Sequence, residues 1–299
     1  MSAIPLFPSP GQAGADLVVT EEHAAPRRVR RWYTQPALAS GLILIVIILV
    51  AAFGAPLLAP YNPIAQNLNA TLLGPSAHHL LGTDNLGRDE FSRLLYGLRN
   101  DIQIAFIAVL FPFCIGVVLG SISGYFGGWV DIVIMRLVDI VVAFPFYVLI
   151  IALVFVLGPG TRSIYIAITL VGWVSYARII RGEILVAKRQ DYVVAAKSGG
   201  LSAIRIMGKH LLPNVITQAF IYAMSDIVQD MLAIVALGYL GLGVPPPTAD
   251  LGSMISEGQN FVTTHWELTT IPGIAVVIVG LSLSLIGDGL ADLIRPGQT

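Results

Sequence analysis

Long apolar runs, separated by short polar stretches, occupy most of the chain after residue 36. Six of these runs are about 20 residues long, the length that an α-helix needs to cross the hydrocarbon core of a bilayer. The first run is too long for a cleaved signal peptide and lacks a small-residue cleavage site, so we interpret it as a retained helix. The pattern predicts an all-α polytopic membrane protein with six transmembrane helices, near residues 37–59, 101–124, 132–157, 163–181, 214–238 and 269–290.

The stretch between the fourth and fifth runs, residues 182–213, is too long and too regular for a simple connection. Asp191 can cap a short helix, the Gly-Gly pair at 199–200 can end it, and Ser202 can cap a second helix. Pro213 then marks the start of the next span. The sequence therefore predicts two short helices outside the membrane.

Composition supports the membrane assignment, because 56% of the residues are hydrophobic and only 12% are charged. The formal net charge of −1 leaves no basic surface large enough to neutralise a phosphate backbone. Membrane lipid is therefore an expected partner, and nucleic acid is not.

The Lys and Arg residues are distributed unevenly between the two sides of the membrane. If the N-terminus is cytoplasmic, thirteen of the seventeen lie on the cytoplasmic side, seven of them between Arg178 and Lys209. Positive charge accumulates in cytoplasmic loops, so both termini are expected in the cytoplasm. Residues 1–31, of which the first 26 are rich in Pro, Ala and Gly, are expected to form a disordered cytoplasmic tail. Residues 32–100 are expected to hold the first transmembrane helix and an extracytoplasmic segment.

Two acidic residues, Asp226 and Asp230, lie inside the fifth apolar run. Their i, i+4 spacing places them on one helix face, and Gln229 lies close enough to widen this polar stripe. A carboxylate in contact with lipid is unfavourable, so both are expected to face the bundle interior or water. Two interpretations stay open. The stripe lines a translocation pathway, or the acids bond to neighbouring helices in a purely structural role.

Small residues recur every four positions in the second run, at Gly116, Gly120 and Gly124, which permits close helix–helix approach. This stripe is typical of ordinary bundle packing, and it is also compatible with a tight seam in a moving bundle. The one cysteine, Cys114, lies in the same run and is expected to be a small core residue.

Two local features are predicted in the third run. Arg136 and Asp139, three positions apart, are expected to form an ion pair near its inner end. Pro145 is expected to kink the same helix further out.

No residue pattern indicates catalysis or a metal site. His78 and His79 are too few for a zinc site and are expected to be a solvated loop pair. The sequence has neither a nucleophile elbow nor the G-x-x-x-x-G-K-[ST] phosphate loop, so it has no visible means of hydrolysing ATP. No catalytic residue, metal ligand or cofactor is therefore expected in this chain.

Residues 60–100 are expected to form an ordered element outside the membrane, because they contain a polar turn from Thr83 to Asp89. The carboxylates of Asp84 and Asp89 are expected to cap helices or to pair with Arg88 or Arg93. Exposed pairs of this kind contribute only ~0–1 kcal/mol. The element is therefore expected to position a gate or a binding protein.

Several of these stretches resemble motifs of ATP-binding-cassette (ABC) importer permeases. Residues 194–213 are similar to the family's E-A-A-x3-G-x9-I-x-L-P motif, although Val194 replaces the usual Glu and His210 the usual Ile. Residues 81–89 resemble the L-G-T-D-x-x-G-R-D signature of the dipeptide, oligopeptide and nickel branch. Further matches lie at residues 123–128, 239–247 and 287–290.

The resemblance covers roughly residues 32–296 and implies the C-type subunit of a type I ABC importer permease. Residues 101–295 would form the family's transmembrane domain, with five helices and the coupling segment 182–213. The residues of that segment that would dock on an ATPase are Asp191, Ala195, Ala196, Gly200, His210 and Pro213. The residues of the extracytoplasmic motif are Gly82, Asp84, Gly87, Arg88 and Asp89.

The resemblance also implies partners and a location. A homologous B-type permease would complete a heterodimer, and one or two cytoplasmic ATPase subunits would bind the ATP and Mg. An extracytoplasmic binding protein would deliver the substrate. The complex would lie in the plasma or inner membrane of a bacterium or archaeon.

Peptides are the expected cargo, and the alternatives are nickel chelates, heme-like molecules, glutathione and small sugars. A rival hypothesis is a secondary transporter coupled to protons through Asp226 and Asp230. Such a transporter often shows an internal inverted repeat, and none is visible in the sequence.

Overall fold

The computed structural model describes residues 36–294, so the predicted tail of residues 1–31 and Arg295 lie outside the described residues. The regular elements of the described range are all helical. The longer helices are α1 (Pro36–Phe53), α3 (Glu90–Phe126), α4 (Gly128–Val142), α5 (Phe146–Leu157), α6 (Thr161–Ala187), α9 (Leu212–Tyr239) and α11 (Glu267–Ile294). The short α-helices are α2 (Ala55–Leu58), α7 (Asp191–Ser198), α8 (Ala203–Ile206) and α10 (Leu251–Gly258).

Five helical stretches of the described range are long and apolar enough to cross a membrane, and α4 and α5 add a sixth if this bent pair counts as one span. Five of the six predicted spans are therefore present as continuous helices. The predicted third span is broken and not merely kinked, because α4 and α5 meet at 85°. Pro145 begins α5 with an extended backbone. Proline lacks an N–H and disfavours helical geometry in the residue before it, which explains the break.

The helix ends differ from the predicted spans. Helix α3 begins at Glu90, eleven positions before the predicted span at residue 101, and has 37 residues. At 1.5 Å per residue it is about 55 Å long, whereas the hydrocarbon core is about 30 Å thick. Its first turns therefore extend beyond the membrane. Helix α6 continues to Ala187, past the predicted end at residue 181. The hydrophobic pattern missed these turns because they carry polar side chains.

The glycine stripe of α3 packs directly on α6. A Cβ atom added at Gly116 would lie 2.4 Å from the backbone oxygen of Trp173, and one at Gly120 would lie 2.5 Å from that of Ala177. At Gly124 the nearest atom would be the Arg181 oxygen at 3.0 Å. The stripe is therefore a packing seam between two helices of the same chain.

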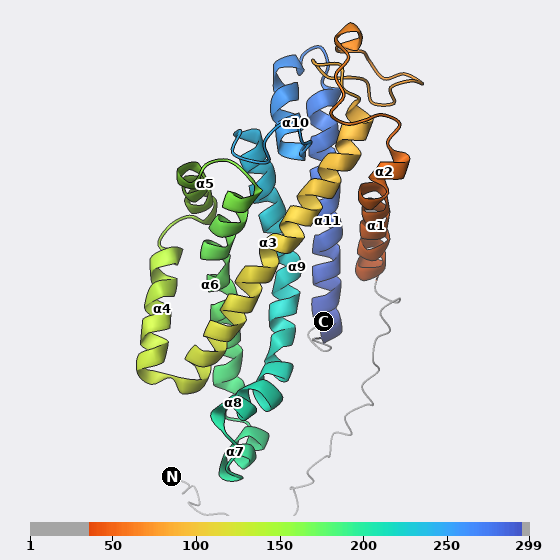
Figure 1. Ribbon diagram of the computed structural model, residues 1–299. Coiled ribbons are helices and arrows are strands. Elements are labelled where there is room, and N and C mark those ends of the chain that lie inside the picture. Colours follow the sequence, from red (N-terminus) through yellow and green to blue (C-terminus); the bar gives the residue numbers. More distant parts are fainter. Residues whose placement is uncertain (1–35, 295–299) are drawn as a thin grey trace, which may run out of the picture.

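Helix α1 lies antiparallel to α11, and glycines again permit the contact. A Cβ atom at Gly41 would lie 2.9 Å from Leu285, and one at Gly289 would lie 2.6 Å from Leu38. The start of α1 and the end of α11 both point toward the end of the bundle that carries α7 and α8 (Figure 1).

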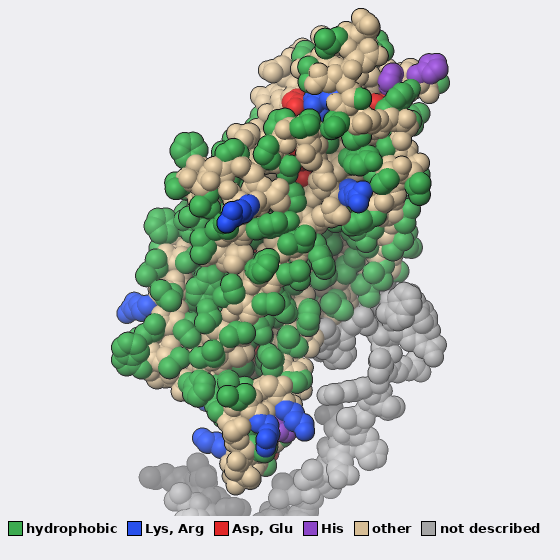
Figure 2. All heavy atoms as spheres, in the orientation of Figure 1, with side chains coloured by type: hydrophobic (Ala, Val, Ile, Leu, Met, Phe, Trp, Pro, Cys, Tyr) green, Lys and Arg blue, Asp and Glu red, His purple; other side chains and the backbone are tan. Residues whose placement is uncertain are grey.

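Hydrophobic side chains cover the middle of the visible face, and Lys and Arg gather around α7 and α8 (Figure 2). Cys114 belongs to the exposed surface of the chain, so its prediction as a core residue is wrong. Helix α3 buries the face that carries Pro112 and Gly116, and Cys114 lies between them on another face. The pair Arg136–Asp139 is present at 3.9 Å, with both side chains exposed.

Candidate functional site

The motif that the sequence predicts to be extracytoplasmic, residues 82–89, folds into a tight turn that is closed by a bridge between Thr83 and Asp89. Gly87 has a positive φ of 69°, and a Cβ atom there would lie 1.9 Å from the backbone oxygen of Asn67. Only glycine fits this position. The hydroxyl of Thr83 donates to the Ala70 oxygen at 2.5 Å, which ties the turn to the segment before it.

Asp84 lies at the centre of this turn. One carboxylate oxygen accepts hydrogen bonds from the backbone N–H groups of Leu86 and Arg88, both at 2.8 Å. The other accepts from Arg88 Nε at 2.5 Å and from Arg93 Nη1. Asp84 therefore shapes the backbone and holds two guanidinium groups.

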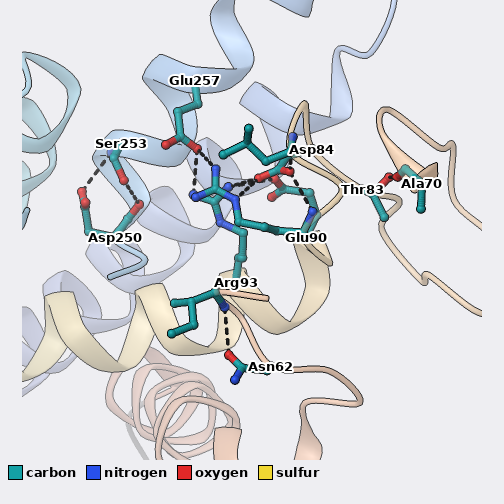
Figure 3. A network of polar contacts seen from close by, with 12 residues as sticks. Asn62, Ala70, Thr83, Asp84, Glu90, Arg93, Asp250, Ser253 and Glu257 are labelled. Atoms are coloured by element: carbon teal, nitrogen blue, oxygen red, sulfur yellow. Dashed lines mark hydrogen bonds and ion pairs between the residues drawn. The ribbon is translucent and has the colours of Figure 1, made fainter. Parts of the chain in front are cut away.

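Both arginines also reach a carboxylate on α10, far away in the sequence. Arg88 Nη2 donates to Glu257 Oε2 at 2.7 Å, and Arg93 Nη2 donates to the same oxygen at 2.8 Å (Figure 3). We call Asp84, Arg88, Arg93 and Glu257 the outer ion cluster. It joins the motif, the start of α3 and α10.

The outer ion cluster is largely buried, which corrects the expectation of exposed pairs. Asp84, Arg88 and Arg93 are only 3%, 4% and 2% exposed, and the Glu257 side chain is 34% exposed. Loss of one partner from a buried ion pair leaves an uncompensated charge, so each partner is expected to matter more than at a surface.

Asp89 begins α3 as its N-cap. Its carboxylate accepts from the Ser92 backbone at 2.8 Å and from the Ser92 hydroxyl at 2.7 Å. The same residue lies 2.9 Å from Nδ1 of His79, whose ring stacks on Tyr61 with a centroid distance of 4.8 Å. His79 is therefore a packed residue and not half of a solvated pair. The described residues contain no group of three potential metal ligands.

A second set of contacts holds the start of α10. Asp250 is its N-cap and accepts from the Ser253 backbone at 2.9 Å. Asp101 on α3 accepts from the Leu251 backbone at 3.0 Å, and Asn100 donates to the Ala249 oxygen at 2.7 Å. Burial raises the pKa of Asp250, and the hydrogen bonds from Ser253 oppose this shift.

The acidic residues of α10 and its surroundings were not among the predicted site residues. The Asp-x-x-Ser pattern at residues 250–253 is a recognisable N-cap signal. No local signal identifies Glu257 or Asp101, because their partners are more than 140 positions away in the sequence.

The two short helices predicted in the coupling segment are present as α7 and α8. Gln190, not Asp191, is the N-cap of α7, and no side chain caps this helix, so the predicted capping role of Asp191 is wrong. Ser202 is the N-cap residue of α8, but its hydroxyl makes no capping bond.

The predicted glycine break is confirmed. Gly200 has φ of 76°, the Gly200 N–H donates to the Lys197 oxygen at 3.1 Å, and the Leu201 N–H donates to the Ala196 oxygen at 3.2 Å. This pair of bonds is a Schellman motif, which requires a left-handed residue where Gly200 lies.

The predicted docking residues differ in their exposure. Ala196 and His210 are half-buried, and Ala196 packs against the chain's own core. Met207–Leu211 forms a π-helical turn in which the Leu212 N–H donates to the Met207 oxygen. Pro213 lies in the first turn of α9. The exposed docking residues are Asp191, Ala195, Gly200 and Pro213.

Asp226 and Asp230 are buried inside the chain, at 3% and 1% exposure, so neither faces lipid. The Tyr176 hydroxyl on α6 donates to Asp226 Oδ2 at 2.7 Å. Both oxygens of Asp230 lack a hydrogen-bond partner among the described residues. Gln229 is half-buried. The contact with Tyr176 supports the structural interpretation of Asp226, and the pathway role stays a prediction.

The apolar spans define a multi-pass membrane protein. The segment of α7 and α8 projects from one end of its bundle, and the outer ion cluster lies at the other end (Figure 1). Residues 116–299 match the family described as "Binding-protein-dependent transport system inner membrane component". Residues 30–75 match the "N-terminal TM domain of oligopeptide transport permease C". The chain belongs to this family of inner-membrane permease subunits of ABC importers.

Relatives cover most of the chain. The dipeptide transport system permease protein DppC of Haemophilus influenzae is 39% identical over 86% of this chain and 89% of its own length. The oligopeptide transport system permease protein OppC of Bacillus subtilis is 38% identical over 86% of this chain and 84% of its own. The probable D,D-dipeptide transport system permease protein DdpC of Escherichia coli is 38% identical over 87% of this chain and 88% of its own length.

Solved structures support the fold. The MetNI methionine ABC transporter matches with a TM-score of 0.54 at 18% identity, over 68% of this chain and 97% of that one. An amino acid ABC transporter matches with a TM-score of 0.52 at 16% identity, over 66% and 91%. The predicted importer permease fold is therefore confirmed.

Proposed function

We propose that this permease subunit imports dipeptides and short oligopeptides. The relatives that this chain matches over 84–89% of their length are named for dipeptide, D,D-dipeptide or oligopeptide transport. Their names support this class of cargo. The binding protein would supply most of the selectivity, and the permease would provide half of the path. The alternative cargoes are nickel chelates, heme-like molecules and glutathione. Measuring the affinity of the binding protein for a panel of these substrates distinguishes them from peptides.

One observation supports the proposal of ATP-driven transport more than any other. Helices α7 and α8 project from the end of the bundle, and Lys and Arg side chains surround them (Figures 1 and 2). Apolar side chains are exposed on the same helices, including Ile204 at 79% and Val194 at 52%. Single exposed apolar side chains are ordinary, but apolar side chains gathered on one short segment and rimmed by charge are typical of a protein interface. We assign this partner as a cytoplasmic ATPase.

The remaining partners follow from this assignment. A B-type permease forms the other half of the heterodimer, one or two ATPase subunits bind ATP and Mg, and a binding protein docks on the extracytoplasmic side. This chain itself holds no cofactor and catalyses no reaction. We also propose that both termini are cytoplasmic. The start of α1 and the end of α11 point toward the side that carries α7 and α8, which supports this orientation (Figure 1).

Reconstitution tests this function. The four-part complex in proteoliposomes, with ATP on the coupling-segment side, is expected to accumulate a radiolabelled dipeptide only when the binding protein is present. A complex with an ATPase variant that binds but does not hydrolyse ATP is the control. Uptake that follows a proton gradient without ATP would instead support the secondary transporter.

A further inference from the structure

Helix α4 is weakly held by apolar packing. Of its fifteen residues only Ile134 and Val138 are buried, and most of its large side chains are exposed. Its polar side-chain contacts with other helices of the described range are made by Asp131 in its first turn, which pairs with Arg181 on α6. Neither residue belongs to a motif that the family resemblance identifies.

The contact has the fork geometry of a strong carboxylate–guanidinium pair. Arg181 Nε donates to Asp131 Oδ1 at 2.5 Å, and Arg181 Nη2 donates to Oδ2 at 2.6 Å. The Ser123 hydroxyl on α3 adds a third bond to Oδ1 at 2.5 Å. The Asp131 side chain is only 20% exposed and the Arg181 side chain 30%, so solvent screens this pair less than an exposed pair.

The pair lies at the base of the coupling segment. Arg181 is six positions before the end of α6 at Ala187, and α7 begins at Asp191. The next residue of the chain after α6, Lys188, donates from Nζ to the Gly124 oxygen at 2.8 Å. Both bonds join the end of α6 to the region where α3 turns into α4.

The coupling helices share a core with the same end of α6. Ile184 of α6, Val193 of α7 and Ile206 of α8 belong to one cluster of buried apolar residues. Close-packed clusters transmit displacement because they cannot deform freely. A shift of α7 and α8 is therefore expected to move the end of α6.

We propose that Asp131 is the positioning residue that transmits movement of the coupling segment to the broken span α4–α5. This proposal rests on the proposed function, in which an ATPase moves α7 and α8. Arg181 carries the movement from α6, Asp131 receives it at the first turn of α4, and α4 leads through the 85° break into α5. Replacement of Asp131 by the neutral Asn removes the charge-assisted part of this contact, so that α4 no longer follows the movement of α6.

The chain offers a matched control on the same helix. Asp139 is also an acidic residue of α4, but its pair with Arg136 is long, at 3.9 Å. The Arg136 side chain is 79% exposed and the Asp139 side chain is 67% exposed. Asp139→Asn changes the charge of α4 by the same amount and leaves the contact with α6 intact.

The experiment measures dipeptide transported per ATP hydrolysed, in proteoliposomes that contain the whole complex. Asp131→Asn is expected to lower this ratio about tenfold, as the loss of about 1.4 kcal/mol from one state would do, with ATPase association unchanged. Asp131→Glu restores part of the ratio because it keeps the charge, and Asp139→Asn leaves it at the wild-type value.

Several results overturn the proposal. An unchanged ratio in Asp131→Asn shows that transmission to α4 does not need the contact between Asp131 and Arg181. If ATPase association also falls while the ratio is unchanged, the role of Asp131 is structural only. If the Asp131→Asn complex does not assemble, Ser123→Ala takes its place, because it removes only the hydroxyl bond to Asp131. Ser123→Ala should lower the ratio of dipeptide transported to ATP hydrolysed, to a smaller extent. An unchanged ratio in Ser123→Ala also overturns the proposal. A wild-type complex that does not transport dipeptide refutes the proposed function instead.

Discussion

The guanidinium of Arg93 donates from Nη2 to Oε2 of Glu257 across 2.8 Å, although 164 positions separate the two residues. Through this bond and its neighbours, the extracytoplasmic motif and α10 form one polar unit at the outer end of α3. The outer end is therefore a built structure and not a flexible connection.

Removal of the central carboxylate should destabilise this unit most. Asp84→Asn leaves two buried guanidinium groups short of negative charge, and we expect a loss of ~3–5 kcal/mol in stability. Glu257→Gln should cost less, because the Glu257 side chain is 34% exposed. Thermal unfolding of the purified permease pair measures both, with exposed Asp139→Asn as the unchanged control. Equal effects of Asp84→Asn and Asp139→Asn would show that burial of the cluster does not matter.

The glycine seam between α3 and α6 should not tolerate a larger residue. Gly120→Val would force a side chain toward the Ala177 oxygen, which lies 2.5 Å from the Cβ position. We expect a loss of ~1–3 kcal/mol, typical of overpacking, visible as a lower unfolding temperature. Gly182→Val on α6 is the control, since nothing lies within 4 Å of its Cβ position.

The left-handed break between α7 and α8 should require glycine. Gly200→Val places a β-branched residue at φ of 76°, which costs ~1–2 kcal/mol or alters the turn and misaligns α8. We expect weaker copurification of the ATPase and slower transport. Gly208→Val has open space and no positive φ, so it is the control. Full ATPase association and transport in both Gly200→Val and Ala196→Asp would refute the docking assignment.

Thiol labelling separates the two roles of Asp226 and Asp230. Because Cys114 is exposed, the experiment uses a Cys114→Ser background. A cysteine at 226 or 230 should be inert in this conformation, in which both positions are buried. If the face lines the pathway, a water-soluble reagent should react with it in another nucleotide state. Inertness in every state leaves only the structural role.

The N-cap of α10 should make stability depend on pH. Burial raises the pKa of Asp250 above its unfolded value. The folded chain then holds this proton more tightly than the unfolded chain, so stability falls as pH rises from the ordinary Asp range through the raised pKa. Asp250→Asn keeps the cap and removes the buried charge. Its unfolding temperature should exceed that of the wild type at neutral pH, and the gap should narrow in acid. A gap that widens in acid contradicts the sign of the shift.

The sequence by itself determined the class, the apolar spans and the two short helices of the coupling segment. These are local properties, because an apolar run of sufficient length needs no other part of the chain to specify a span. The Gly-Gly pair at 199–200 likewise ends α7 through its own backbone geometry. The family motifs also lie in contiguous stretches, so the permease family was predictable.

Tertiary structure decided which polar residues meet and which faces are covered. The bond between Arg88 and Glu257 of α10 joins residues 169 positions apart, and no local pattern specifies that contact. The same holds for Arg181 and Asp131, 50 positions apart on different helices. Cys114 is exposed because α6 packs on the face of α3 that carries the glycines, and periodicity alone does not say which face of an apolar helix finds a partner.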